Sequence, residues 1–145
     1  AAKLFTREEP SPAFAEAPPL ARFGLSDVEI SRNGMLRGCD GLTGHCVVEV
    51  DRLSPWQPDF RPVLEAAFFH PRMTHPPQYW KVGRHLVKKR TRLSFRFPQT
   101  SPDSQPPLLG SVLVYFQLVI PVPLGPFEGL QRASNPVAVP VTLVD

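Results

Sequence analysis

Hydrophobic and polar residues alternate along three stretches of the chain, at residues 25–31, 46–51 and 90–97. Successive side chains of a β-strand point to opposite faces of a sheet, so this period of two predicts strands with one buried and one solvated face. In the third stretch Phe95 and Phe97 share the face predicted to be buried, and the arginines share the other face.

Two further stretches are apolar without so clear an alternation. Residues 111–120 are hydrophobic at both parities, which is typical of a central strand covered on both faces. The segment 135–145, "NPVAVPVTLVD", predicts a last strand, and Pro140 favours an edge position because proline cannot donate a ladder hydrogen bond. Asn33 and Gly34 predict a β-hairpin near Asn33, since both central residues of its turn need a positive φ.

One short helix is predicted between Asp59 and Phe69. Asp59 can cap its N-terminus, and Pro62 is tolerated in a first helical turn. His70 and Pro71 then end the helical segment. The 19 prolines of the chain argue against any long helix.

Proline also divides the chain into two parts. Residues 1–22 hold four prolines and show no periodicity, so we expect an extended Pro-rich arm. Residues 23–145 are long enough to bury one core without a metal or a disulfide. Strands separated by proline-marked turns predict a mainly β fold for this single domain, an antiparallel β-sandwich or jelly roll with one short helix.

Charge is segregated along the sequence. The chain carries a net charge of +3, yet residues 66–102 contain eight Lys or Arg residues and no carboxylate. The remaining residues hold eight basic against thirteen acidic side chains. Because a concentrated positive field attracts anionic partners, this segment is the candidate binding surface. Its predicted binding residues are Lys81, Arg84, Lys88, Lys89, Arg90, Arg92, Arg96, Tyr79 and Trp80.

Several explanations of the basic segment are open. The ordinary one is a solvated strand face that meets acidic residues of the same fold and discourages edge pairing. Another is an acidic protein surface or other subunits of an assembly, with an anionic membrane surface as a minor variant. Nucleic acid is the third, with Tyr79 and Trp80 stacking on bases. Phe95 and Phe97 do not support nucleic acid, because they fall on the strand parity opposite to the arginines.

Potential metal ligands are scattered along the chain. Six residues separate Cys39 from Cys46, a spacing that matches no recurrent zinc motif, and free thiols are favoured over a bridge between them. The other potential ligands follow no recurrent pattern either: His45, His70, His75 and His85. We therefore predict no metal and no cofactor.

Gly38, Gly41 and Gly44 are spaced like the glycines of a phosphate-binding loop. Such a loop leads into a helix N-terminus, whereas the residues after Gly44 have the pattern of a strand. A turn or a β-bulge is therefore the favoured interpretation.

Nucleophile and base pairs are equally unspecific. His45 is badly placed to activate Cys46, because adjacent strand residues face opposite sides, and Ser94 with a histidine is the remaining candidate. Glu49 and Asp51 share a strand face, which is commonplace for outer positions of a strand. No catalytic residue is predicted.

These patterns favour a non-enzymatic structural or protein-interaction module of a larger assembly, which uses a basic strand face and the Pro-rich arm. The alternatives are a nucleic-acid-binding subunit, such as a ribonucleoprotein component or a viral coat, and an unrecognised hydrolase or transferase. No membrane span is predicted, since the longest apolar run, residues 111–120, is about half of the roughly 20 residues that a span needs. The sequence leaves the compartment open.

Overall fold

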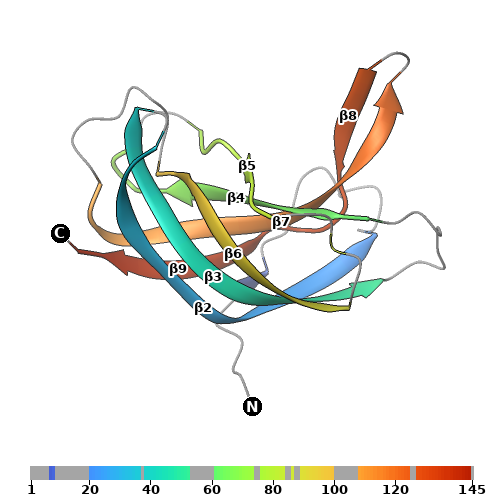
Figure 1. Ribbon diagram of the computed structural model, residues 1–145, viewed down its shortest axis with the longest axis horizontal. Coiled ribbons are helices and arrows are strands. Elements are labelled where there is room, and N and C mark those ends of the chain that lie inside the picture. The colour runs from blue at the N-terminus through green and yellow to red at the C-terminus, as the bar shows by residue number, and fades with distance from the viewer. Residues whose placement is uncertain are drawn as a thin grey trace.

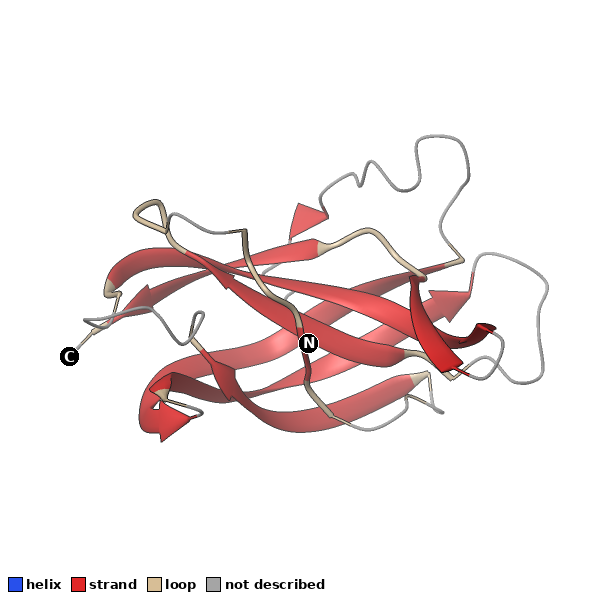
Figure 2. Cartoon of the chain, turned by 90° about the horizontal axis from the view of Figure 1, so that it is seen from above, coloured by secondary structure: helices blue, strands red, loops and turns tan. Residues whose placement is uncertain are grey.

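The structure is a computed structural model that describes residues 7–8, 20–36, 38–52, 61–73, 76–83, 86, 89–99, 108–124 and 127–144. Two antiparallel sheets pack face to face (Figures 1 and 2). The mainly β, sandwich-like architecture predicted from the alternating pattern is thereby confirmed.

The smaller sheet has three strands in the order β2-β3-β6. These strands are β2 (Ala21–Leu36), β3 (Cys39–Arg52) and β6 (Arg90–Pro98). The larger sheet follows the order β1-β9-β7-β4-β5, and β8 pairs with the far end of β7. Its strands are β1 (Arg7–Glu8), β4 (Val63–Phe69), β5 (Trp80–Lys81), β7 (Gly110–Leu124), β8 (Phe127–Arg132) and β9 (Val137–Leu143).

The predicted helix is wrong. Its second half, Val63–Phe69, is strand β4, which pairs with β7 on one side and β5 on the other. Residues 63–68 are all buried, because both faces of this inner strand are covered. A strand buried on both faces loses the alternation that would have identified it. Asp59, the predicted cap, lies outside the described residues.

The hairpin predicted near Asn33 exists, but Asn33 and Gly34 are not its turn. The last pair of β2 with β3 is Leu36↔Cys39, and Asn33 and Gly34 lie inside β2 where the register shifts. Gly34 has a φ of 77°, the positive value that was expected of it. It uses this conformation in a β-bulge, in which two residues of one strand face one residue of the other.

A second bulge changes which residues of β2 face the core. Asp27 has a φ of 51°, and the register with β3 shifts at this point. Before the bulge the odd positions Phe23 and Leu25 are buried, and after it the even positions Val28 and Ile30 pack against the core. The extra residue therefore keeps apolar side chains inside along a long, twisted strand.

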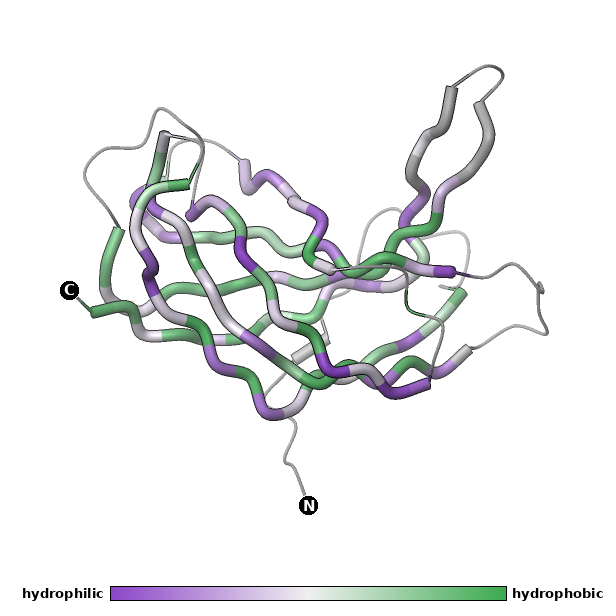
Figure 3. Tube along the Cα trace, in the orientation of Figure 1, coloured by the Kyte–Doolittle hydropathy of each residue, from purple (hydrophilic) through white to green (hydrophobic). Residues whose placement is uncertain are grey.

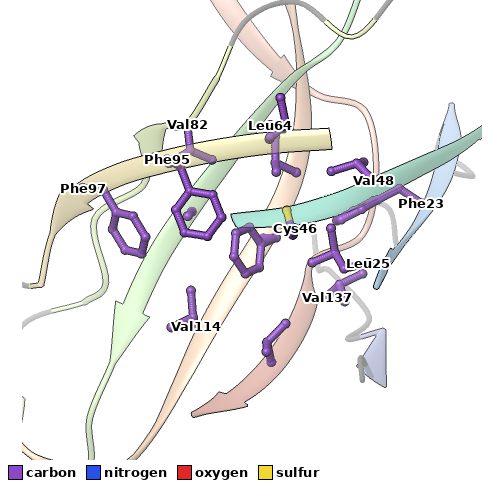
Figure 4. Close-up of a cluster of buried hydrophobic side chains, with 14 of the residues drawn as sticks. Phe23, Leu25, Cys46, Val48, Leu64, Val82, Phe95, Phe97, Val114 and Val137 are labelled. Carbon is purple, nitrogen blue, oxygen red and sulfur yellow. The ribbon is translucent and has the colours of Figure 1, made fainter. Parts of the chain in front are cut away.

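The core lies between the two sheets (Figure 4). Phe95 and Phe97 of β6 are buried as predicted, and Phe95 makes an edge contact with Phe116 of β7 at a centroid distance of 5.8 Å. Alternating hydrophilic and hydrophobic positions are visible along the small sheet (Figure 3). β7 is a central strand between β4 and β9, which confirms the prediction from its apolar sequence.

A backbone junction at Ala133 joins the two sheets. The carbonyl oxygen of Ala133 accepts hydrogen bonds from the N–H groups of Leu20 and Ala21, at 2.9 and 3.0 Å, where β2 begins. The N–H of Ala133 donates to the carbonyl of Leu118 in β7. The start of the small sheet is thus fastened to the centre of the large one.

Two residues of the predicted N-terminal arm, Arg7 and Glu8, form β1 and pair with Val137 and Ala138 of β9. Pro140 lies beyond this pairing, on the part of β9 whose outer side has no strand partner among the described residues, as its sequence predicted. In the described part of the chain, no helix is long and apolar enough to cross a membrane.

Candidate partner-binding surface

The basic strand β6 is an edge strand of the small sheet, because β3 is its only strand partner among the described residues. Its buried positions alternate with the exposed positions Arg90, Arg92, Ser94 and Arg96. The register places the three arginines opposite Glu49, Val47 and Thr43 respectively. The sequence therefore placed the arginines correctly on one solvated face.

Arg90 is engaged within the sheet. Its guanidinium donates to Glu49 Oε1 at 2.9 Å, and the two side chains are 60% and 50% exposed. A cross-strand pair this open to water is screened and worth about 0.2–1 kcal/mol. The pair nevertheless neutralises one charge of the basic strand.

Arg96 lies on the same face of β6 as Arg90, but it binds backbone carbonyls instead of a carboxylate. Its guanidinium donates to the carbonyl oxygens of Met35 and Asn33, at 3.1 and 3.4 Å. Both carbonyls belong to the bulged end of β2, two strands away in the sheet. Arg96 therefore reaches across β3 and holds the hairpin end rather than presenting all its donors to a partner.

Two further cations lie at this edge of the small sheet: Lys89 in the bend just before β6, and Arg92 on the exposed face of β6. Both are exposed, and Arg92 lies opposite Val47, whose own exposure is 3%. Within the described ranges the structure records no ion pair or hydrogen bond for either side chain. Lys89 does accept a backbone hydrogen bond from Val50 N–H at 2.9 Å, which fixes the approach to β6. The accessible charge is thus concentrated at Lys89 and Arg92.

The other predicted binding residues lie elsewhere. Lys81 and Trp80 form β5 at the edge of the large sheet, where Lys81 pairs with Glu65 and Trp80 pairs with Ala66. Trp80 packs partly against the core, so most of its ring is not presented outward. Arg84 and Lys88 lie outside the described residues.

Tyr79 precedes β5 and is partly buried. Burial raises its pKa to about 12, against the opposing effect of nearby Arg132, and Tyr115 and Glu65 add to the increase. Its hydroxyl is therefore protonated at neutral pH.

A buried side-chain pair links β7 to β4. Gln117 Nε2 donates a hydrogen bond to Glu65 Oε1 at 3.0 Å.

The histidines that the structure describes have structural partners. His70 is 8% exposed, its Nδ1 accepts from the backbone N–H of Arg72 at 3.0 Å, and its Nε2 lies 3.0 Å from Leu109 O. A carbonyl oxygen only accepts, so these contacts fit the tautomer in which Nε2 carries the proton and Nδ1 accepts. Both ring nitrogens are therefore occupied by the backbone. His75 and His85 lie outside the described residues.

Cys39 and Cys46 are buried and do not form a disulfide. Burial raises the pKa of Cys46 to about 12, so its sulfur is a protonated, unreactive thiol at neutral pH. Among the described residues, no three His, Cys, Asp or Glu side chains are grouped as a metal ion would require.

The glycine series belongs to the β2–β3 hairpin. Gly38 has a φ of 84° beside the turn, whereas Gly41 and Gly44 lie within β3. A Cβ on Gly44 would overlap with the carbonyl oxygen of Glu29, so the glycine permits close approach of two backbones. The turn interpretation therefore holds for Gly38, whereas Gly41 lies opposite the bulge of β2 and Gly44 pairs regularly with Ile30.

The candidate pair of Ser94 with a histidine has a counterpart in the fold. Ser94 of β6 lies opposite His45 of β3, and His45 Nε2 lies 3.6 Å from Glu29 Oε2 of β2, a third member that the sequence did not indicate because it comes from another strand. The side chains of His45 and Glu29 are 39% and 79% exposed. This arrangement of a serine, a histidine and an exposed glutamate differs from an acyl-transfer triad, in which a buried carboxylate orients the histidine.

These features define a β-sandwich protein with one arginine-bearing edge strand. A scan against protein-family models, a search of curated proteins and a search of solved structures each gave no match. The functional argument therefore depends on the residues themselves.

Proposed function

We propose that this protein is a non-enzymatic interaction module of a larger assembly, which binds an acidic protein segment at the outer face of its small sheet. The observation that carries the proposal is the pair Lys89 and Arg92. Lys89 is exposed in the bend before the edge strand β6 and Arg92 is exposed on that strand, whereas Arg90 and Arg96 are held by Glu49 and by backbone carbonyls. Unpaired cations on a rigid strand favour recognition of an anionic partner.

An acidic segment suits this surface better than nucleic acid. Stacking on bases needs exposed aromatic rings beside the cations. Phe95 and Phe97 are instead buried in the core, and Trp80 packs partly against it. An extended acidic segment alongside β6 would place carboxylates opposite the arginines, as Glu49 is already placed opposite Arg90.

The experiment compares two charge reversals. The double variant Lys89→Glu/Arg92→Glu removes the accessible cations, and Arg72→Glu makes a similar change at an exposed residue after β4. Binding of a fluorescent poly-glutamate peptide is measured by anisotropy at low and at physiological salt. We expect the double variant to bind at least about tenfold more weakly, and Arg72→Glu to stay within about twofold of the wild type.

Two results would overturn the proposal. One is that wild-type protein does not bind the acidic peptide at low salt. The other is tighter binding of a labelled single-stranded oligonucleotide, with an affinity that falls steeply with salt, which would assign the surface to nucleic acid. Capture of partners from the native source, with and without nuclease, would separate these outcomes in a natural mixture.

A further inference from the structure

The edge strand β6 directs a regular row of backbone groups away from its sheet. In an antiparallel pair, directly opposite residues exchange both N–H···O bonds at every second position. The N–H of Val50 donates to the carbonyl oxygen of Lys89 at 2.9 Å, just before β6. The N–H of Gln99, just after β6, donates to the carbonyl oxygen of Asp40, and the register between these two bonds is unbroken. The odd residues of β6 therefore face β3, and the N–H and C=O groups of the even residues point away from it: Arg90, Arg92, Ser94 and Arg96.

This outward edge of β6 suits the addition of a strand. The four even residues are all exposed, and no described strand pairs with β6 on this side. No bulge interrupts the strand, and its one proline, Pro98, is its last residue. A regular row of unpaired N–H and C=O groups is a template for one further strand.

The other long edge strands are protected against pairing in a different way. β2 is bulged at Asp27 and again at Gly34, and β9 carries Pro140. Bulges and prolines both prevent the addition of a strand to an edge. β6 carries positive charge instead, which disfavours a second β6, because like charges directly opposite each other are destabilising. The same charge favours a strand that bears carboxylates.

The positions of the cations define which residues of an added strand would be acidic. A residue directly opposite Arg92 would share its exposed face of the sheet. Glu49 shows this arrangement on the other side of β6, where its Oε1 accepts from Arg90 at 2.9 Å. The intervening residues would lie on the face of Leu93 and Phe95, which are buried in the core. Acidic residues would therefore alternate with uncharged ones.

We infer that a partner segment with alternating acidic and uncharged residues adds to β6 as an antiparallel fourth strand of the small sheet. Every strand pair that the structure describes is antiparallel. Backbone hydrogen bonds to the even residues of β6 hold the segment, and a carboxylate opposite Arg92 selects it. The inference rests on the proposed function and adds to it the backbone pairing, which binding by charge alone does not need.

Backbone methylation of a peptide tests this pairing on wild-type protein. The probe is a short fluorescent peptide in which glutamate alternates with threonine. With the glutamates opposite the arginines, the glutamate N–H groups face β6 and the threonine N–H groups face water. By anisotropy at low salt, we expect N-methylation of the glutamates to weaken binding at least about tenfold, and N-methylation of the threonines to change it less than about threefold. The charge of the peptide is the same in all three forms.

The outcomes separate this inference from the proposed function. Equal affinities of the two methylated peptides would overturn the strand addition. If Lys89→Glu/Arg92→Glu still abolished binding of the unmodified peptide in that case, the proposed function would stand. A larger loss on methylation of the threonines would exclude the antiparallel register. If wild-type protein bound no acidic peptide at all, the proposed function and this inference would fail together.

A proline in β6 tests the same edge from the side of the protein. Ser94→Pro removes an outward N–H, keeps every cation, and leaves the ladder with β3 intact, because a proline whose nitrogen faces outward is tolerated on an edge strand. We expect this variant to bind the alternating peptide at least about tenfold more weakly. Thr142→Pro is the matched control, with a proline at an exposed position of another edge strand, β9, and should bind like wild-type protein. Equal binding by the two variants would contradict the pairing, and the methylated peptides decide the question if Ser94→Pro does not fold.

Discussion

Ser134 shows how one buried hydroxyl supports the centre of the large sheet. Its Oγ accepts a hydrogen bond from the N–H of Leu118 at 2.9 Å, and the residue is 1% exposed. Ser134→Ala would leave that N–H buried without an acceptor. We expect the free energy of unfolding to fall by about 2 kcal/mol, measured by urea denaturation.

Ser94→Ala is the matched control, since Ser94 is exposed on the outer face of β6. It should change the free energy of unfolding by less than about 0.5 kcal/mol. Equal urea midpoints for Ser134→Ala and the wild type would contradict the role given to the Ser134 hydroxyl.

The buried thiol of Cys46 leads us to expect that the protein loses stability at alkaline pH. Burial raises the pKa of its thiol from 9.0 to about 12, so the folded protein holds this proton more tightly than the unfolded chain does. The contribution of this thiol to the free energy of unfolding is fully present below pH 9. It is lost between pH 9 and about 12, by at most about 1.4 kcal/mol per pH unit. Urea denaturation at several pH values in this window measures the slope.

Tyr79 titrates in part of the same window, because burial raises its pKa from 10.0 to about 12. The comparison with Cys46→Ala separates the two groups. That variant loses side-chain packing at every pH, but its stability should fall less steeply above pH 9 than that of wild-type protein. Parallel slopes would show that the thiol does not contribute.

At the scale of elements, Gly44 sets the geometry of the bulged β2–β3 pair. A Cβ at this position would overlap with the carbonyl oxygen of Glu29, a backbone atom that cannot rotate away. Gly44→Ala should therefore lower the free energy of unfolding by about 3 kcal/mol, the upper part of the range for overpacking. Thermal and urea unfolding both report this change.

Gly38 gives the contrasting control in the same hairpin. A Cβ on Gly38 would meet nothing within 4 Å, but the residue has a φ of 84°. Gly38→Ala should therefore cost only the penalty of the left-handed conformation, about 1 kcal/mol. If both alanine variants lost the same stability, close packing at Gly44 would not be the cause.

The elements that could be predicted from the sequence are those with one solvated face. β6 and the second half of β3 follow their alternating pattern, and β7 was recognised by its continuous apolar run. β4 was mistaken for a helix, because both of its faces are buried and "VLEAAFF" has no period of two. Burial on both faces depends on the neighbouring strands, which a local pattern does not contain.

The central strand is longer than its apolar run. The sequence predicted it over residues 111–120, but β7 continues through Pro121 and Pro123 to Leu124. β4 no longer flanks β7 beyond Val119, so a nitrogen without hydrogen on that side leaves no ladder bond unmade. The partners of the arginines could not be predicted from the sequence either. Only the fold shows that Glu49 binds Arg90 and that two backbone carbonyls bind Arg96.

At the scale of the whole molecule, the segregated charge of the sequence is partly compensated in space. The register of β3 with β6 places Glu49, which lies outside the basic segment 66–102, opposite Arg90 of that segment. The basic segment and the rest of the chain thus meet at this pair. The net field at this face comes from few side chains, which is why the double reversal at Lys89 and Arg92 is a sharp test.

The contrast between the dense sandwich and the projecting ribbon that β8 forms with residues 119–124 of β7 predicts two classes of amide exchange (Figure 1). The N–H groups of Phe116 and Leu118 lie in a central strand and should exchange only when the whole protein unfolds. Those of Gly129 and Gln131 lie in β8 opposite Val122 and Ile120 of β7, the partner of β8 among the described strands, and should exchange through local opening, at least about a hundredfold faster.

The exchange rates can also contradict this division of the molecule. Equal rates in the ribbon and in the central strand, or ribbon amides that exchange only on global unfolding, would show that β8 does not open independently of the sandwich.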